Sequence, residues 1–182
     1  MSIKTILIVL GEPNSTFSEV LLKYYSSKFS RSNKNRIVLI GNKKLFYKQM
    51  RKLKYNFNIK EINTIKEYSA NFINIINIDN KFKNAFSKIT SNSAEYIEKC
   101  FDLSLKIIKE KKTQFLINGP VSKKYFLNKK FPGITEYVAS KTNSTEPVML
   151  IYNKKLSVSP LTTHIPIKSV FRNVKKKKLS TI

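Results

Sequence analysis

The only histidine of the chain, His164, stands where an apolar stretch gives way to a sharp turn, in the segment Pro-Leu-Thr-Thr-His-Ile-Pro of residues 160–166. A neutral imidazole can bind a divalent metal through a ring nitrogen, and it can exchange protons near neutral pH. A turn histidine whose ring is satisfied by nearby backbone groups would have the same local sequence. His164 is therefore a candidate metal ligand or proton carrier, and its position alone leaves the structural alternative open.

Two further residues have a type and a position that suit the binding of an anionic ligand. Thr135 follows the Pro132-Gly133 turn at the expected start of a helix, where its hydroxyl and the free backbone amides could contact a phosphate. The alternative is that Thr135 only caps the helix. Lys123 follows the Gly-Pro-Val-Ser segment 119–122 and could pair with an anionic substrate, or it could be one more solvated lysine of a basic chain.

Other kinds of chemistry are limited by what the sequence contains. It has four glycines, and neither the G-x-G-x-x-G nor the G-x-x-x-x-G-K-[ST] pattern occurs, so a Rossmann or P-loop phosphate site is excluded. No nucleophile elbow supports Ser-His-Asp catalysis. Glu12 is a possible polar site residue, although an acid near the start of a helix is also favoured by the helix dipole. Cys100 is the only cysteine, so an internal disulfide and a multi-cysteine metal site are impossible.

The elements that must position these residues alternate between short apolar runs and stretches of helical periodicity. The runs predict strands at residues 6–10, 36–40, 72–78, 114–118, 147–152 and 156–161. The periodic stretches predict helices at residues 17–29, 43–53, 92–111, near 122–128, from 135 to about 141, and from 167 onward. Such alternation is typical of an α/β fold with a largely parallel sheet and flanking helices. Ligands of such sheets bind at the carboxyl ends of the strands, where Glu12, Lys123, Thr135 and His164 would then gather.

The clearest of these helices covers residues 92–111. Asn92 is placed to cap it, and Glu95, three residues later, could reach back as in a capping box. Cys100 falls within the apolar stripe of this helix, so we expect it to be a small core residue rather than a reactive thiol.

Composition and charge bound the class of protein. The chain has 182 residues, of which 41% are hydrophobic, and a formal net charge of +24 from 35 lysines and arginines against 11 acidic residues. Such a charge raises the question of a nucleic-acid or membrane-surface partner. The basic residues are nearly all lysines and are spread along the chain, which disfavours a nucleic-acid site. No apolar run suits a membrane span or a cleaved signal peptide, and a lone cysteine fits a reducing compartment, so a cytoplasmic location is expected.

Six segments, taken in order, resemble the 4-hydroxythreonine-4-phosphate dehydrogenase family of vitamin B6 biosynthesis. They are Gly-Glu-Pro at 11–13, Asn-Ser-Ala at 92–94, Asn-Gly-Pro-Val-Ser-Lys at 118–123, Phe-Pro-Gly-Ile-Thr-Glu-Tyr at 131–137, Pro-Val-Met-Leu at 147–150 and Leu-Thr-Thr-His-Ile-Pro-Ile at 161–167. The resemblance spans nearly the whole chain but only the amino-terminal portion of the longer family protein. It implies that residues 1–182 are the amino-terminal portion of a dehydrogenase-like α/β protein, similar in fold to isocitrate and isopropylmalate dehydrogenases, with the carboxy-terminal part missing.

The resemblance also implies an activity and a set of site residues. The family carries out the NAD-dependent oxidation, with decarboxylation, of 4-phosphooxy-threonine, a phosphorylated hydroxy-amino acid, in pyridoxal phosphate biosynthesis. A divalent metal (zinc, magnesium or cobalt) assists the reaction, and the family works as homodimers. By position, His164 matches a metal ligand of the family and Thr135 a substrate contact. Lys123 lies in a family motif and is expected to contact substrate.

The sequence departs from the family pattern in ways that bear on activity. Ile134 stands where the family usually has a histidine before the substrate-binding threonine, and Asn-Ser-Thr-Phe-Ser at 14–18 replaces a glycine-rich turn. The other two metal-binding histidines of the family lie beyond residue 182. We therefore expect this chain to be inactive alone, because a catalytic metal needs about three protein ligands. The alternatives are a relative acting on another phosphorylated hydroxy acid and a non-catalytic basic module that binds nucleic acid.

Overall fold

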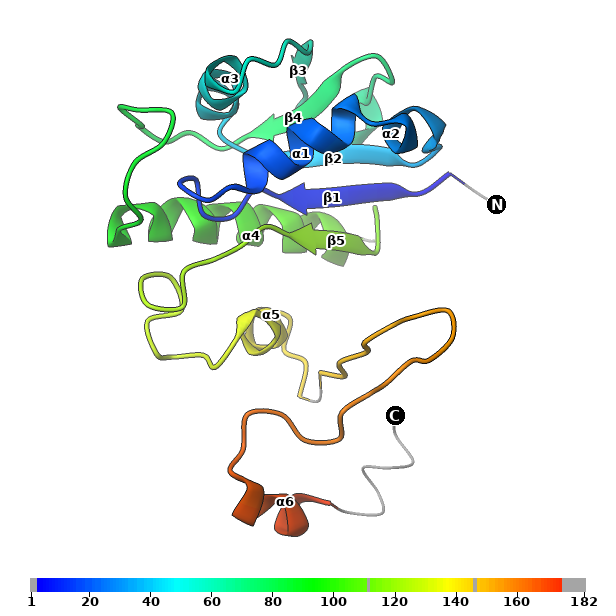
Figure 1. Ribbon diagram of the computed structural model, residues 1–182, viewed down its shortest axis with the longest axis vertical. Coiled ribbons are helices and arrows are strands. Elements are labelled where there is room, and N and C mark those ends of the chain that lie inside the picture. Colours follow the sequence, from blue (N-terminus) through cyan, green and yellow to red (C-terminus); the bar gives the residue numbers. More distant parts are fainter. Residues whose placement is uncertain (1–2, 111, 146, 175–182) are drawn as a thin grey trace. The chain divides into compact units, whose positions relative to one another are not determined.

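The computed structural model describes residues 3–110, 112–145 and 147–174, which divide into two compact units (Figure 1). The first unit is Met1–Asn128 and the second is Lys129–Ile182. The first contains a sheet and its covering helices, and the second contains two short helices joined by extended chain.

The first unit is built on a five-stranded sheet in which every pair of neighbouring strands is parallel. The strands are β1 (Thr5–Val9), β2 (Arg36–Gly41), β3 (Ile59–Glu61), β4 (Ile73–Asn77) and β5 (Phe115–Asn118), and their order is β3-β4-β2-β1-β5. The central strands β1 and β2 are short runs of apolar residues because crossover helices cover both faces of a parallel sheet. The expected α/β fold with a parallel sheet is confirmed.

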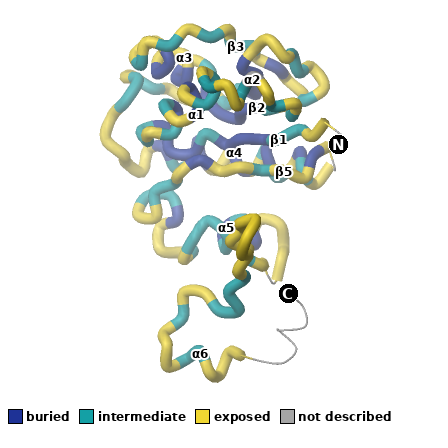
Figure 2. The backbone as a smooth tube through the Cα atoms, turned by 45° about the vertical axis from the view of Figure 1, so that its right-hand side comes forward, coloured by how far each residue is buried: buried dark blue, intermediate teal, exposed yellow. Residues whose placement is uncertain are grey.

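Four helices flank the sheet: α1 (Phe17–Ser26), α2 (Lys28–Ser32), α3 (Lys43–Lys52) and α4 (Ala94–Lys109). One core cluster joins α1 and α3 to one face of the sheet; it contains Ile8, Leu21, Leu22, Leu39, Phe46, Met50, Ile73 and Ile75. Because side chains alternate along a strand, Leu7, Val9, Val38 and Ile40 face the opposite side, where α4 contacts β1 and β2. Both layers are buried, as the dark segments of Figure 2 show.

Several boundaries in this unit differ from the expectation. The helix expected at 17–29 ends at Ser26, and the separate helix α2 begins after Ser27, whose side chain accepts a hydrogen bond from the Ser30 amide. The three-residue strand β3 was not expected, because its segment is too short and too polar to show a pattern. No helix forms near 122–128: these residues make successive turns, with one helical hydrogen bond from Phe126 N to Ser122 O.

The start of α4 also differs from the expected capping box. The helix begins at Ala94, after a 3-10 turn over Ser91–Ser93 in which the Thr90 hydroxyl accepts a hydrogen bond from the Asn92 amide. The Ser93 hydroxyl donates 2.7 Å to Glu12 Oε2 instead of capping α4. Glu95 forms an exposed ion pair with Lys99 at 2.7 Å. The prediction that Asn92 and Glu95 form the cap is wrong. The hydroxyl at the helix start belongs to Ser93, and it donates a hydrogen bond to the carboxylate of Glu12, which is distant in the sequence.

The second unit contains α5 (Ile134–Lys141) and α6 (Ile167–Asn173). The strands expected at 147–152 and 156–161 do not form among its described residues, where only one antiparallel bridge joins Ile151 to Val158. Two strands without a third neighbour or a covering helix are marginal in water, whatever their apolar pattern. Most residues of this segment are accordingly exposed, and Figure 2 colours them so.

Charged residues lie mostly at the surface. Four ion pairs occur among the described residues: Lys23–Glu19, Lys43–Glu61, Lys99–Glu95 and Lys112–Glu110. All four are partly or largely solvent-exposed, so each contributes little to stability. Within the described parts of the chain, no helix combines the length and the apolar character that crossing a membrane requires.

Candidate functional site

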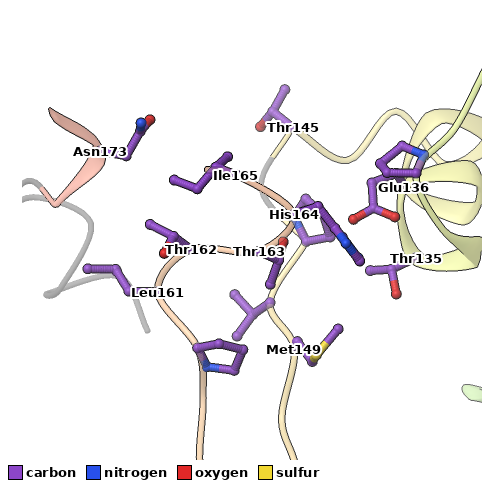
Figure 3. A pocket seen from close by; sticks show the side chains of 14 residues that line it. Thr135, Glu136, Thr145, Met149, Leu161, Thr162, Thr163, His164, Ile165 and Asn173 are labelled. Atoms are coloured by element: carbon purple, nitrogen blue, oxygen red, sulfur yellow. The ribbon is translucent and has the colours of Figure 1, made fainter. Parts of the chain in front are cut away.

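A pocket of about 610 Å³ lies in the second unit and has both Thr135 and His164 in its wall (Figure 3). The start of α5 contributes Thr135 and Glu136, and the turn before α6 contributes Thr162, Thr163 and His164. The remainder of the lining is mostly apolar and comes from the extended chain; it includes Pro147, Val148, Met149, Pro160 and Leu161. An apolar pocket with a few convergent polar groups is the usual form of a small-molecule site.

Thr135 is the second residue of α5, and the N-cap position belongs to Gly133. Glycine has no side chain to occupy the free amides of the first helical turn, and no side-chain capping bond is formed at this helix start. The interpretation of Thr135 as the helix cap is therefore wrong. Thr135 stands in the same turn as these uncapped amides, a position whose partial positive charge suits an anionic group.

His164 has a backbone φ of 56°, the left-handed conformation that a residue with a side chain rarely adopts. The strand expected at residues 156–161 does not form, so His164 follows irregular chain and not a sheet strand, which corrects that part of the prediction. The turn nevertheless brings His164 into the same pocket as Thr135. The ring is solvent-exposed, as a ligand to an exchangeable group needs to be.

Glu136 also lines the pocket; the sequence patterns marked its position beside Thr135 but gave Glu136 no role of its own. A Cβ atom placed on Gly133 would lie 2.9 Å from Glu136 Oε2 and 4.0 Å from His164 Nε2. The carboxylate and the imidazole are thus neighbours across the glycine, and Figure 3 shows them facing each other at one end of the pocket. The signal that could have revealed Glu136 is its place directly after Thr135 in a polar helix start.

Lys123 is not among the residues that line this pocket. It is exposed in the first unit, in the turns that follow Gly119 and Pro120. Its expected role as a substrate contact stays a prediction.

Glu12 is 2% exposed and serves the architecture of the first unit. Its carboxylate accepts hydrogen bonds from the Ser93 hydroxyl at 2.7 Å and the Asn14 amide at 3.1 Å. Its own amide donates 2.7 Å to Pro120 O, so the loop after β1 is joined to the chain after β5 and to the start of α4. These bonds explain the buried acid without a ligand.

The donors in the pocket are of the kinds that a divalent cation accepts, an imidazole nitrogen and a carboxylate oxygen. Among residues 3–110, 112–145 and 147–174, no group of three or more His, Cys, Asp or Glu side chains is close enough to hold a metal ion. The described residues therefore fit one part of a metal site, with His164 as the nitrogen donor.

Comparison with known proteins shows the family to which the chain belongs. The family model described as "Pyridoxal phosphate biosynthetic protein PdxA" matches residues 33–182. The chain belongs to the PdxA family. The family resemblance noted in the sequence is thereby confirmed, and the matched region includes the pocket and most of the sheet.

Individual PdxA relatives match along nearly the whole chain. A 4-hydroxythreonine-4-phosphate dehydrogenase from Sulfurihydrogenibium is 33% identical over 177 residues, which cover 94% of this chain and 53% of that protein. A D-threonate 4-phosphate dehydrogenase from Salmonella typhimurium is 22% identical and covers 100% of this chain and 57% of that protein. The chain thus spans about half the length of the curated relatives it matches.

A solved structure shows the same fold. The crystal structure of a 4-hydroxythreonine-4-phosphate dehydrogenase from Burkholderia phymatum superposes with a TM-score of 0.85 at 20% identity, covering 100% of this chain and 56% of that one. The α/β architecture is therefore that of PdxA proteins, and it corresponds to part of their fold.

Proposed function

We propose that this chain forms part of a PdxA-type dehydrogenase that oxidises 4-phosphooxy-threonine, with decarboxylation, in pyridoxal phosphate biosynthesis. The observation that carries the proposal is the pocket of the second unit, which brings Thr135 and His164 together from segments about thirty residues apart. Family membership and the names of the relatives agree with this activity.

The chain's own residues would bind and orient the substrate. The Thr135 hydroxyl and the uncapped amides at the start of α5 suit an anionic or hydroxyl group, and the apolar wall holds the carbon skeleton out of water. His164 would contribute one ligand to a divalent metal (zinc, magnesium or cobalt), which would polarise the substrate oxygen as a Lewis acid. NAD is proposed as the oxidant on the family resemblance, without a particular residue of this chain to hold it.

We further propose that the site is completed by protein other than the described residues. Two or more metal donors are needed besides His164, and the described residues offer no group of three donors. The second unit also exposes large apolar side chains, including Tyr152 at 72%, Ile167 at 92% and Phe171 at 90%. Exposed apolar surface of this kind marks a protein contact, which fits a homodimer of the family type.

An assay of reconstituted activity tests the proposal. The purified chain is mixed with 4-phosphooxy-threonine, NAD and each metal, and NADH formation is followed by absorbance, with and without the remaining half of the Sulfurihydrogenibium relative. We expect turnover only in the mixture. His164→Ala should abolish it and Thr135→Ala should lower kcat/KM by about tenfold to 100-fold, since a hydrogen bond to a charged group contributes about 1.5–3 kcal/mol.

A matched control is Thr142→Ala, a threonine directly after α5 whose hydroxyl donates to the Val138 carbonyl and which lies outside the pocket. It should leave kcat/KM unchanged. Turnover by the chain alone would contradict the proposal that other protein completes the site, and no turnover in any mixture would contradict the dehydrogenase assignment.

A second candidate substrate is another phosphorylated hydroxy acid. Ile134 stands where a histidine is usual, and a relative of this chain is named D-threonate 4-phosphate dehydrogenase. Isoleucine cannot hydrogen-bond through its side chain, so it disfavours a substrate group that needs a donor at that point. Replacing 4-phosphooxy-threonine by D-threonate 4-phosphate in the same assay separates the two candidates by their kcat/KM values.

A further inference from the structure

The Glu136 carboxylate contains an oxygen that the chain buries without pairing it. Oε2 of Glu136 has essentially no exposed surface and no hydrogen-bond partner among the described residues. Burying a carboxylate oxygen without a donor is unfavourable, and such atoms are rare in folded proteins. We therefore expect a hydrogen-bond donor close enough to reach Oε2 after a small rotation of a side chain.

An acidic residue near a helix start has an ordinary explanation, attraction to the free amides of the first turn. Glu19 shows that explanation in this chain, because it is the third residue of α1 as Glu136 is the third residue of α5. Its side chain is 38% exposed and pairs with Lys23 at 2.7 Å. Glu136 holds the same helix position but turns an oxygen away from solvent, so the helix start alone does not account for it.

The neighbouring side chain that can donate a hydrogen bond to Glu136 is His164. Apart from its chain neighbours, the described atoms within 4 Å of a Cβ placed on Gly133 are Glu136 Oε2 at 2.9 Å and His164 Nε2 at 4.0 Å. Nε2 is therefore the ring atom nearest to Gly133 on the side of the carboxylate's position, and Figure 3 shows the two groups at the same end of the pocket. Because Gly133 is a glycine, it places no side-chain atom beside these two groups.

We infer that Glu136 is the positioning residue of His164, accepting a hydrogen bond from Nε2–H. That bond fixes the ring orientation and the tautomer, and it leaves the lone pair of Nδ1 for a cation, as carboxylates do for metal-binding histidines elsewhere. Because the His164 ring is exposed and lies on an irregular turn, packing against neighbours does little to fix its orientation. The role of this hydrogen bond in metal binding rests on the proposed function. The hydrogen bond itself can be tested in the metal-free chain.

The test uses the fact that His164 is the only histidine in the sequence. A long-range proton–nitrogen NMR spectrum of the ¹⁵N-labelled 182-residue chain, without a histidine tag, contains a single imidazole. It is recorded at increasing pH until the ring signals stop changing, so that the tautomer of the neutral imidazole is observed. We expect a single Nε2–H tautomer whose proton exchanges slowly with water.

Three variants separate positioning from folding. Glu136→Ala should mix the tautomers and speed exchange of the ring proton by about tenfold or more, because it removes a hydrogen bond to a charged acceptor. Glu136→Gln keeps an acceptor and should retain the tautomer. Gly133→Ala keeps Glu136 and an extended backbone, φ −159°, but its Cβ would push Oε2 aside, so it should behave like Glu136→Ala. As a control, Glu19→Ala, at the same helix position in α1, should change nothing at His164.

A wild-type ring with mixed tautomers and fast exchange would overturn the inference, and so would an unchanged His164 signal in both Glu136→Ala and Gly133→Ala. Calorimetric titration with ZnCl₂ measures zinc affinity, and it tests the metal part of the proposed function separately from the hydrogen bond between Glu136 and His164. Where zinc binds, Glu136→Ala should weaken it by about tenfold to 100-fold, and equal affinity would count against positioning. Because other protein is proposed to complete the metal site, absence of zinc binding by the chain alone is compatible with the proposed function, and the NMR result then decides the role of Glu136 by itself.

Discussion

At the scale of single residues, the polar side chains of the pocket and of the core differ in their burial and hydrogen bonding. His164 is exposed on a turn in a left-handed conformation, and Thr135 lies at a helix start without a capping side chain. Glu12 and Cys100 are buried, and their polar atoms are occupied by neighbours or shielded from water. A polar side chain whose hydrogen bonds are already made has little capacity to bind a ligand, which is why we propose the pocket, and not the core, as the site of chemistry.

Cys100 illustrates the buried case and gives a prediction. Burial raises the pKa of its thiol to about 12, so almost no thiolate forms near neutral pH. We expect the folded chain to resist iodoacetamide at pH 7 and to react stoichiometrically once unfolded in urea, as mass spectrometry would show. Rapid labelling of the folded chain would contradict the assignment of Cys100 to the core.

The same thiol contributes to the pH dependence of stability. Its pKa is raised in the folded chain above the ordinary value of 9.0, so the folded state holds the proton more tightly than the unfolded state. The contribution is therefore fully present below pH 9 and is lost as the pH rises towards about 12. Cys100→Ala should flatten this part of the urea-unfolding profile, and an unchanged slope between these pH values would contradict a role for the buried thiol.

At the scale of elements, the loop after β1 and the start of α4 depend on one bond. The Ser93 hydroxyl donates 2.7 Å to the buried Glu12 carboxylate, and both residues are almost fully buried. Ser93→Ala should lower the free energy of unfolding by about 1–3 kcal/mol, because it leaves a buried carboxylate short of a donor. Urea unfolding followed by circular dichroism measures this, with the exposed Ser91→Ala as control. If Ser93→Ala changed the free energy of unfolding no more than Ser91→Ala does, the Ser93–Glu12 hydrogen bond would not be the connection proposed here.

At the scale of the whole molecule, the second unit exposes apolar residues that a protein normally buries. Ile167 and Phe171 lie four residues apart on α6 and are 92% and 90% exposed. We expect sedimentation velocity to show self-association, weakened by about 100-fold or more when both are replaced by serine, since each buried side chain contributes about 1.5–3 kcal/mol. Val20→Ser, which changes an exposed valine of α1, is the control. Association that the double variant leaves intact would place the contact elsewhere.

Much of this architecture was open to prediction from sequence because it depends on local patterns. The apolar runs at β1 and β2 and the periodicity of α4 identify a parallel α/β sheet, since strands buried on both faces must be apolar throughout. The same local patterns singled out Thr135 and His164, and the family resemblance rests on contiguous segments around them. The segments 147–152 and 156–161 have an equally apolar pattern and form no strands, because a strand also needs a neighbour to pair with.

Relations between segments far apart in the chain became visible only once the fold was known. No local pattern indicates that Ser93 donates to Glu12, eighty-one residues away, instead of capping its own helix. Nor does any pattern place the carboxylate of Glu136 beside the His164 ring across Gly133. Sequence encodes burial and periodicity residue by residue, whereas hydrogen-bond partners and pocket walls are set by which surfaces meet once the chain has packed.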